Sequence, residues 1–237
     1  MSPSHPQTEN ADHGLRVPMA DVARFLRQLS HDLRNHLNAA ELQSAYINEV
    51  AEDAELKDEV KRLRAMLSEM GGSLQRLTNS LAPINLSLMP YEAAGFMDDL
   101  RQKVGLQFPE ESRTIEWAIE GGDSLLNIDP QILQQAFIEL FSNAFQHERG
   151  SGSLCAKTEV KGSEFIFTLE EPKTAFAGST ENWGGRPFGK VKHGHYGLGL
   201  PRVRSIVEAH HGQLTARYDS ASSSLLTRVV LPITAGD

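Results

Sequence analysis

The stretch Leu29-Ser30-His31-Asp32-Leu33-Arg34-Asn35-His36-Leu37-Asn38-Ala39 decides the fold that we predict for this chain. Leucines recur in and around it at helical spacing, while polar side chains fall between them, which predicts a helix with one apolar stripe and one polar face. His31 and Asn35 lie one turn apart on the polar face. An imidazole there is able to act as a nucleophile, but a solvated helix face also explains a lone histidine, so the spacing leaves both interpretations open.

The helix around His31 is the first of two long helices. Apolar residues keep close to a heptad step over residues 19–50, and a second heptad run follows at residues 56–81 after the acidic break Ala51-Glu52-Asp53-Ala54. This pattern predicts an antiparallel helical hairpin. Because two helices cannot bury both apolar stripes alone, we expect a homodimer through residues 19–85 in which two hairpins form a four-helix bundle.

The composition is that of an ordinary globular protein and argues against several classes of partner. The chain has 237 residues, of which 40% are hydrophobic and 23% charged, which is enough apolar material for a sizeable core. The net charge of -8 argues against a nucleic-acid partner. No apolar run of membrane-spanning length and no signal-peptide pattern is present, so we expect no membrane segment. Cys155 is the single cysteine, which excludes an internal disulfide and favours a cytoplasmic location.

Prolines mark the boundaries between the parts of the chain. Residues 1–18 lack apolar periodicity and are predicted to be a disordered tail. Pro83 and Pro90 interrupt the helical pattern, so the hairpin domain is predicted at 19–85 and a second domain at 86–237. Helical and strand patterns alternate in the second domain. We predict helices at 92–104, 131–147 and 202–210, and strands at 114–119, 125–128, 154–160, 164–169, 213–218 and 225–231.

The helix predicted at 131–147 carries a polar face. Glu139, Asn143 and His147 recur on it at steps of four, beside a core stripe of leucine, alanine and phenylalanine. A single amide oxygen is a sufficient protein ligand for magnesium, which keeps most of its waters and takes few protein ligands. Solvation of an exposed helix face is the alternative explanation of the same residues.

Glycines precede the last predicted helix. The sequence Gly197-Leu198-Gly199-Leu200 leads directly into the helix that Pro201 opens. Glycines at a helix N-terminus leave backbone N–H groups and the positive end of the helix dipole available to a phosphate. A tight turn that caps a helix has the same short pattern, so this motif gains weight only from its context.

Taken in order, these motifs resemble those of one protein family. Ser30-His31-Asp32-Leu33-Arg34-Asn35 resembles the H-box of sensor histidine kinases, and residues 134–147 resemble the N-box of their ATPase domain. Gly197-Leu198-Gly199-Leu200, with the Val-x-x-Ile-Val-Glu-Ala-His-His-Gly that follows, resembles the G2 box. The resemblance covers residues 25–232. It implies an α+β fold in which the N-terminal hairpin precedes an α/β sandwich of the Bergerat type, which gyrase-type ATPases share.

The resemblance assigns roles to the hairpin residues. It implies that His31 carries a phosphoryl group and that Asp32 accepts a proton from the histidine. Side chains at i and i+1 do not normally face each other on a helix, so the Asp32 carboxylate would have to bend back toward the ring. Asn35 would position a water that removes phosphate from the partner. The implied partner is the receiver domain of a response regulator.

The resemblance also implies ATP and Mg2+ as cofactors of the second domain. Asn143 would be the magnesium ligand, and Glu139 would assist activation of the nucleophile. The nucleotide-binding residues that it implies are Asn143, His147, Glu170, Gly197, Leu198 and Gly199.

The adenine-binding G1 box departs from the family pattern. In Leu169-Glu170-Glu171-Pro172-Lys173-Thr174, Glu170 stands where the family has its adenine-reading aspartate, and both family glycines are replaced. A lost or misplaced buried hydrogen bond costs about 1–3 kcal/mol, which is roughly ten- to a hundredfold in affinity. We therefore expect a reduced affinity for ATP.

We predict a soluble histidine kinase that phosphorylates itself on His31 with ATP and passes the phosphoryl group to an aspartate of a response regulator. The alternative is a histidine phosphotransferase or docking module whose ATPase-like domain no longer binds ATP. A third hypothesis is an ATPase-fold protein that inhibits a regulator without phosphate chemistry. Nucleotide binding separates the first hypothesis from the other two.

Overall fold

The computed structural model describes residues 18–146, 149–176, 178–188 and 196–234. The chain divides into two compact units, Met1–Asn79 and Ser80–Asp237. The predicted tail lies outside the described residues except for Pro18, and so does the predicted ligand His147. Of the described helices, none combines the length and the apolarity required to span a membrane.

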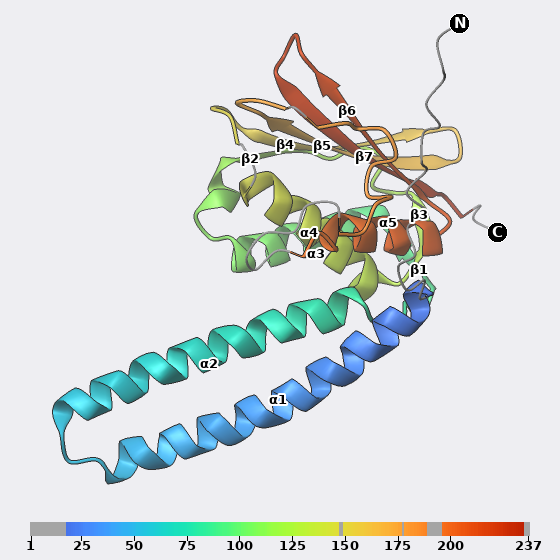
Figure 1. Ribbon diagram of the computed structural model, residues 1–237. Coiled ribbons are helices and arrows are strands. Elements are labelled where there is room, and N and C mark those ends of the chain that lie inside the picture. The colour runs from blue at the N-terminus through green and yellow to red at the C-terminus, as the bar shows by residue number, and fades with distance from the viewer. Residues whose placement is uncertain (1–17, 147–148, 177, 189–195, 235–237) are drawn as a thin grey trace, which may run out of the picture. The chain divides into compact units, whose positions relative to one another are not determined.

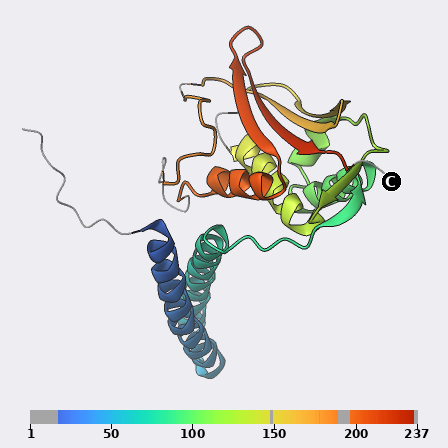
Figure 2. The same ribbon diagram turned by 90° about the vertical axis from the view of Figure 1, so that its right-hand side faces the viewer.

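The N-terminal unit is a helical hairpin, as predicted. Helix α1 (Met19–Val50) begins after Pro18, whose carbonyl accepts backbone hydrogen bonds from the first turn. Helix α2 (Ala54–Ser80) follows a short turn, in which Oδ1 of Asp53 accepts a hydrogen bond of 2.9 Å from the N–H of Glu55. The aspartate thereby satisfies one of the backbone donors that a helix N-terminus leaves without an intrahelical partner. Figures 1 and 2 show the two helices side by side.

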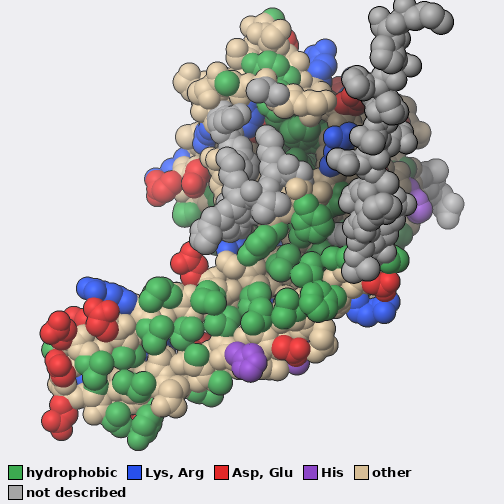
Figure 3. Space-filling view, in the orientation of Figure 1, with side chains coloured by type: hydrophobic (Ala, Val, Ile, Leu, Met, Phe, Trp, Pro, Cys, Tyr) green, Lys and Arg blue, Asp and Glu red, His purple; other side chains and the backbone are tan. Residues whose placement is uncertain are grey.

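Much of the apolar surface of the hairpin is not covered by its own two helices. Val60 is buried, whereas a larger set of apolar side chains on α1 and α2 is exposed. This set comprises Phe25, Leu29, Leu33, Leu42, Tyr46, Val50, Leu56, Leu63, Met66 and Met70. Figure 3 shows hydrophobic side chains gathered along the hairpin. An exposed apolar surface of this extent is typical of an interaction face.

The C-terminal unit is built on a mixed β-sheet. In the described residues its five strands follow the order β2 (Ile115–Ala118), β4 (Leu154–Lys161), β5 (Glu164–Pro172), β7 (Ser224–Pro232) and β6 (Gln213–Asp219). The pair β2–β4 is parallel, and the other pairs are antiparallel. A separate two-stranded sheet pairs β1 (Met89–Glu92) with β3 (Leu125–Ile128), and the short 3-10 helix η1 (Glu111–Thr114) precedes β2.

Helices cover one face of the five-stranded sheet. In the described part of the unit these are α3 (Ala93–Gln107), α4 (Pro130–Gln146) and α5 (Gly199–Ala209). Figures 1 and 2 both show them on the same side of the sheet. The arrangement confirms the predicted α+β class. Strand β5 is three residues longer than predicted, because it continues past Leu169 to Pro172.

The core lies between the sheet and the three helices. Alternate residues of β5 face the helices, and Phe167 and Leu169 are buried there. The ring of Phe167 lies 4.7 Å from the ring of Phe137 on α4, measured between centroids. Because β5 keeps this alternation to its end, Glu171 belongs to the same inner face and Glu170 belongs to the opposite face.

The start of α4 is fixed by Asp129, as the Asp-Pro pattern indicates. Its Oδ1 accepts hydrogen bonds from the N–H groups of Gln131 (3.1 Å) and Ile132 (3.0 Å), and its Oδ2 accepts one from Ser87 (3.0 Å). Burial on its own would raise the pKa of the Asp129 carboxyl. These three backbone donors outweigh burial and lower that pKa below its ordinary value. The fold therefore stabilises the charged carboxylate.

A buried histidine connects the start of α4 to the end of α5. His210 is 1% exposed, and its Nε2 accepts a hydrogen bond of 3.1 Å from the backbone N–H of Asp129. Its Nδ1 donates a hydrogen bond of 2.8 Å to the carbonyl of Ile206. Both bonds together require the neutral ring with its proton on Nδ1. The histidine thus fixes two helices relative to each other, and these helices carry Asn143 and Gly199.

Candidate functional site

His31 lies on α1 with its side chain 66% exposed. Its Nδ1 lies 3.2 Å from Oδ1 of Asp32, and the same oxygen accepts a hydrogen bond of 2.9 Å from Nε2 of Gln28, one turn earlier. The carboxylate therefore bends back toward the ring, although adjacent residues do not normally face each other on a helix. When Nδ1 carries the proton of this bond, the lone pair of Nε2 is left for reaction.

Asn35 is exposed on α1, one turn after His31. An exposed carboxamide offers both a donor and an acceptor, so it is able to bind a water or the backbone of a bound protein. The structure thus keeps His31, Asp32 and Asn35 together on one exposed stretch of the helix.

A second cluster forms where α4 meets the start of α5. Nδ2 of Asn143 donates a hydrogen bond of 3.3 Å to Oε1 of Glu139, and both side chains are half-buried. This bond orients the carboxamide and directs its Oδ1 toward other partners. Gly199 lies against the same carboxylate, because a Cβ added there would overlap Oε1 of Glu139 and lie 2.8 Å from its Cδ. The glycine therefore makes room for Glu139.

The glycine-rich turn before α5 places backbone donors beside this cluster. Gly197 has a φ of 64°, a conformation that residues with a Cβ rarely adopt. Leu198 is 6% exposed, and its carbonyl accepts a backbone hydrogen bond of 3.0 Å from Arg202 within the first turn of the helix. The first turn of an α-helix leaves N–H groups without intrahelical acceptors, so this end of α5 favours an anion.

Glu170 does not lie where the resemblance predicts. Because β5 extends to Pro172, Glu170 falls on the face of the sheet that points away from the helices. Its Oε2 forms an ion pair of 2.9 Å with Nζ of Lys157 on β4, and its side chain is 30% exposed. The sequence contains a signal for this orientation. Because side chains alternate along a strand, counting onward from Leu169 places Glu170 on the outer face and Glu171 on the inner face.

Glu171 and Lys173 occupy the inner face instead, although neither is among the predicted site residues. Their side chains are 9% and 5% exposed, and they form an ion pair of 2.9 Å between Oε2 and Nζ. Burial raises the pKa of the Glu171 carboxyl, and the neighbouring ammonium offsets this only in part. The N–H of Gly150 donates a hydrogen bond of 2.8 Å to the carbonyl of Pro172. The pair therefore lies beside the chain that leaves α4, shortly after Asn143.

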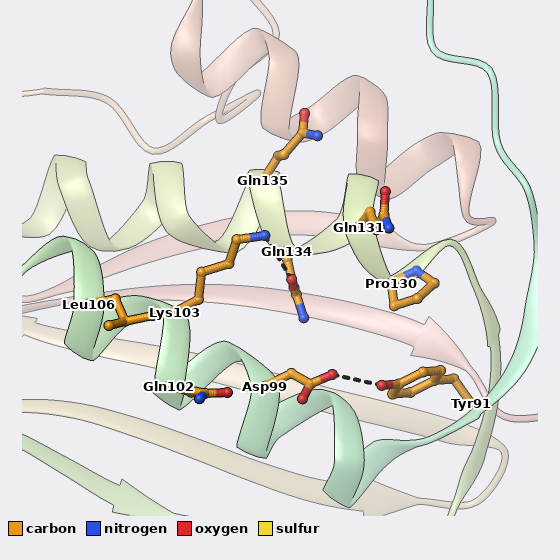
Figure 4. A pocket seen from close by; sticks show the side chains of 9 residues that line it. All are labelled: Tyr91, Asp99, Gln102, Lys103, Leu106, Pro130, Gln131, Gln134 and Gln135. Atoms are coloured by element: carbon orange, nitrogen blue, oxygen red, sulfur yellow. Dashed lines mark hydrogen bonds between the residues drawn. The ribbon is translucent and has the colours of Figure 1, made fainter.

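A separate groove of about 480 Å³ lies between α3 and α4. Figure 4 shows Tyr91 donating a hydrogen bond to Asp99, and Lys103 donating one to Gln134 from the neighbouring helix. Glutamines make up much of its lining. None of the predicted site residues lines this groove, so it is not the candidate site.

Comparison with known proteins relates the chain to sensor kinases, although no protein-family model matches it. It is 22% identical to an uncharacterized sensor-like histidine kinase of Rhizobium meliloti, over 95% of this chain and 46% of that protein. It is 24% identical to the probable sensor kinase SilS of Salmonella typhimurium, over 87% of this chain and 44% of that protein. It is also 24% identical to the sensor histidine kinase ZraS of Escherichia coli, over 84% of this chain and 43% of that protein. The chain spans less than half the length of these relatives.

Solved structures share the fold. Full-length ShkA, in complex with AMPPNP, superposes with a TM-score of 0.71 at 18% identity, over 90% of this chain and 46% of that chain. The catalytic domain of the histidine kinase ThkA gives a TM-score of 0.50 at 19% identity, over 62% of this chain and 95% of that domain. The chain is therefore similar in sequence to sensor histidine kinases, and its fold, a helical hairpin followed by an α+β unit, is also found in solved histidine kinases.

Proposed function

We propose that this chain is a protein histidine kinase that transfers the γ-phosphoryl group of ATP to His31. The observation that supports this most directly is an exposed imidazole whose Nδ1 lies against the Asp32 carboxylate. The relationship to sensor kinases supports the same class of activity. The cluster of Glu139, Asn143 and Gly199 supplies the second requirement, a place for the phosphates of a nucleotide.

Asp32 prepares the imidazole for attack. Its carboxylate accepts a hydrogen bond from Nδ1–H, which favours the tautomer with a lone pair on Nε2 and stabilises the positive charge that develops on the ring. Nε2 then forms a bond to the γ-phosphorus, while the bond from that phosphorus to the bridging oxygen breaks and ADP leaves. The Nδ1 proton passes to Asp32 or to water, so atoms and charge balance.

The residues at the α4–α5 cluster fit the phosphates and the magnesium of a nucleotide. No group of three or more His, Cys, Asp or Glu side chains among the described residues could hold a metal ion by itself. Asn143, whose Nδ2 is engaged by Glu139, would offer Oδ1 to the cation. Magnesium, when bound, supplies positive charge next to the phosphates. The start of α5 binds phosphate oxygens through backbone N–H groups.

The phosphoryl group then passes from His31 to an aspartate of a response-regulator receiver domain. His31 and Asn35 are both exposed one turn apart, so a protein partner is able to reach both side chains at once. In this proposal Asn35 holds the water that removes phosphate from the regulator.

The chain forms a homodimer through residues 19–85 in this proposal, because a second hairpin would cover the exposed apolar side chains of α1 and α2. Replacing Leu29 and Leu33, each 41% exposed, by glutamate is expected to dissociate the dimer, since the added charges would be buried in the bundle. Light scattering after size exclusion measures the mass. Asn38→Glu adds a charge at an exposed polar position and should leave the dimer intact. If the double variant stays dimeric, Leu29 and Leu33 do not lie in the dimer interface.

Gly199→Ala is expected to slow phosphorylation by about tenfold or more while the free energy of unfolding changes by less than about 1 kcal/mol. The new Cβ would overlap the Glu139 carboxylate, which is the movable end of a flexible side chain, so the carboxylate shifts and the fold persists. The rate of label transfer and urea unfolding are measured on the same preparation. Gly105→Ala in α3 is the control, because nothing lies within 4 Å of a Cβ added there, and it should leave the rate unchanged. An unchanged rate in Gly199→Ala contradicts a role for this cluster.

Asp32→Asn is expected to lower the initial rate of phosphorylation by roughly a hundredfold, because the amide cannot take the Nδ1 proton or stabilise the developing charge. Gln28→Ala is the matched control, since it removes the other group bonded to Oδ1 of Asp32 and leaves the carboxylate in place. It should change the rate only a few fold. Equal rates in Asp32→Asn and wild type would remove Asp32 from the mechanism.

Incubation of the purified chain with γ-labelled ATP and magnesium tests the proposed activity. We expect label on the protein that survives alkali and is lost in acid, as a phosphorus–nitrogen bond is. Calorimetric titration with ATP and magnesium measures binding separately from transfer. A wild-type chain that takes up no label rejects the proposal.

A further inference from the structure

The ion pair of Glu171 and Lys173 is a buried feature that the proposed reaction does not use. Backbone contacts hold the end of β5 on both sides. The N–H of Lys173 donates a hydrogen bond of 2.8 Å to the carbonyl of Ser223, and a Cβ added at Gly150 would lie only 3.0 Å from the nitrogen and the carbonyl carbon of Lys173. The backbone from which the Lys173 side chain leaves is therefore firmly placed.

The Glu171 carboxylate has a charged partner in the same buried surroundings. Its Oε2 lies 2.9 Å from Nζ of Lys173. Leu225, 2% exposed, lies opposite Glu171 on the neighbouring strand, and Tyr218 lies opposite Leu225 on the strand beyond. In such surroundings a carboxylate without its partner would gain strongly from a donor that reaches it.

The pair lies at the end of the unit that carries the nucleotide cluster. The inner face of β5 packs on α4 through Phe167 and Phe137, and the chain that leaves α4 returns to the end of β5 at Gly150. Asn143 lies in the last turn of α4. By strand alternation, Glu171 faces inward, whereas Glu170, which the family resemblance assigns to adenine, faces outward.

We propose that Lys173 keeps the Glu171 carboxylate occupied, so that the site holds a nucleotide through its phosphates and magnesium and gains little from the purine amino group. This inference rests on the proposed function. An N–H of the purine 6-amino group and the Lys173 ammonium compete for one carboxylate, and the ammonium is both charged and part of the same chain. Lys173 is thus a specificity-determining residue that sets how strongly adenine is distinguished from other purines.

The test compares two nucleotides that differ only at the purine amino group. ATP carries the 6-amino group, and purine riboside triphosphate has hydrogen in its place. Calorimetric titration of the wild-type chain with each, in magnesium, is expected to give affinities within about threefold of each other. In Lys173→Met the freed carboxylate should favour ATP by about tenfold or more, the ratio that a hydrogen bond to a charged group gives.

The chain offers a matched control on the other face of the same strand. Lys157 pairs with Glu170 at 2.9 Å, the same distance, but this pair lies on the outer face with side chains 50% and 30% exposed. Lys157→Met should leave the wild-type ratio of the two nucleotides unchanged. Glu171→Leu with Lys173→Met replaces the buried pair by apolar groups, which buried ion pairs often tolerate, and should lose the preference for ATP again.

Circular dichroism checks that each variant is folded, since Lys173→Met leaves Glu171 buried without its partner. The wild-type comparison stands without any variant, because a wild type that already favours ATP tenfold overturns the inference. A folded Lys173→Met that binds the two nucleotides equally well also overturns it and leaves the proposed function in place. Failure of wild type and Lys173→Met to bind either nucleotide contradicts both.

Discussion

Replacing His31 by alanine is expected to abolish phosphoryl transfer from ATP while the chain still folds and binds nucleotide. The imidazole is the nucleophile of the proposed reaction, and alanine has no atom that replaces Nε2. The side chain is 66% exposed, so its removal leaves no cavity and should change the free energy of unfolding by less than about 0.5 kcal/mol. Label transfer and calorimetric affinity for ATP are measured on the same preparation.

His36→Ala is the control for this result. His36 is exposed on the same helix, so it reports any general effect of removing an imidazole from α1. It should keep wild-type label transfer. Label that persists in His31→Ala, or that disappears in His36→Ala, would assign the phosphoryl group to another residue.

His210→Ala is expected to destabilise the C-terminal unit by about 3 kcal/mol, from a cavity and from a backbone N–H left without its acceptor. The ring is 1% exposed, and it bonds both to Asp129 at the start of α4 and to Ile206 in α5. Urea unfolding followed by circular dichroism gives the change in free energy. Because the ring holds the two helices of the nucleotide cluster in register, the affinity for ATP should fall as well.

His211→Asn is the matched control for His210→Ala. His211 is exposed and has a φ of 60°, a conformation that asparagine tolerates better than other non-glycine residues. Its substitution should change the free energy of unfolding by less than about 1 kcal/mol. If His210→Ala lowers the free energy of unfolding by no more than His211→Asn does, the buried hydrogen bonds to Asp129 and Ile206 contribute little to stability.

Local patterns were sufficient to predict most of the secondary structure. The heptad spacing of apolar residues over 19–50 predicted α1 correctly, because residues spaced in this way lie on one face only when the chain is helical. Asp129 before Pro130 predicted the start of α4, since a carboxylate caps the first turn and a proline needs no N–H there. Both signals lie within a few residues of the structure that they describe.

Features that depend on strand length or on distant contacts were not predictable in the same way. The difference between Glu170 and Glu171 depends on β5 continuing to Pro172, and that extension is stabilised by Gly150 from outside the strand. The bond between Asp129 and His210 joins residues 81 positions apart, so no local pattern announces it. The approach of Asp32 to His31 depends on side-chain rotamers, which spacing along a helix does not determine.

The most direct measurement is the position of the phosphoryl group on the ring, by heteronuclear NMR of the phosphorylated chain with 15N-labelled histidine. We predict a phosphoryl group on Nε2 of His31, with Nδ1 facing the carboxylate of Asp32. A phosphoryl group on Nδ1 of His31, or on any other residue, would contradict the mechanism.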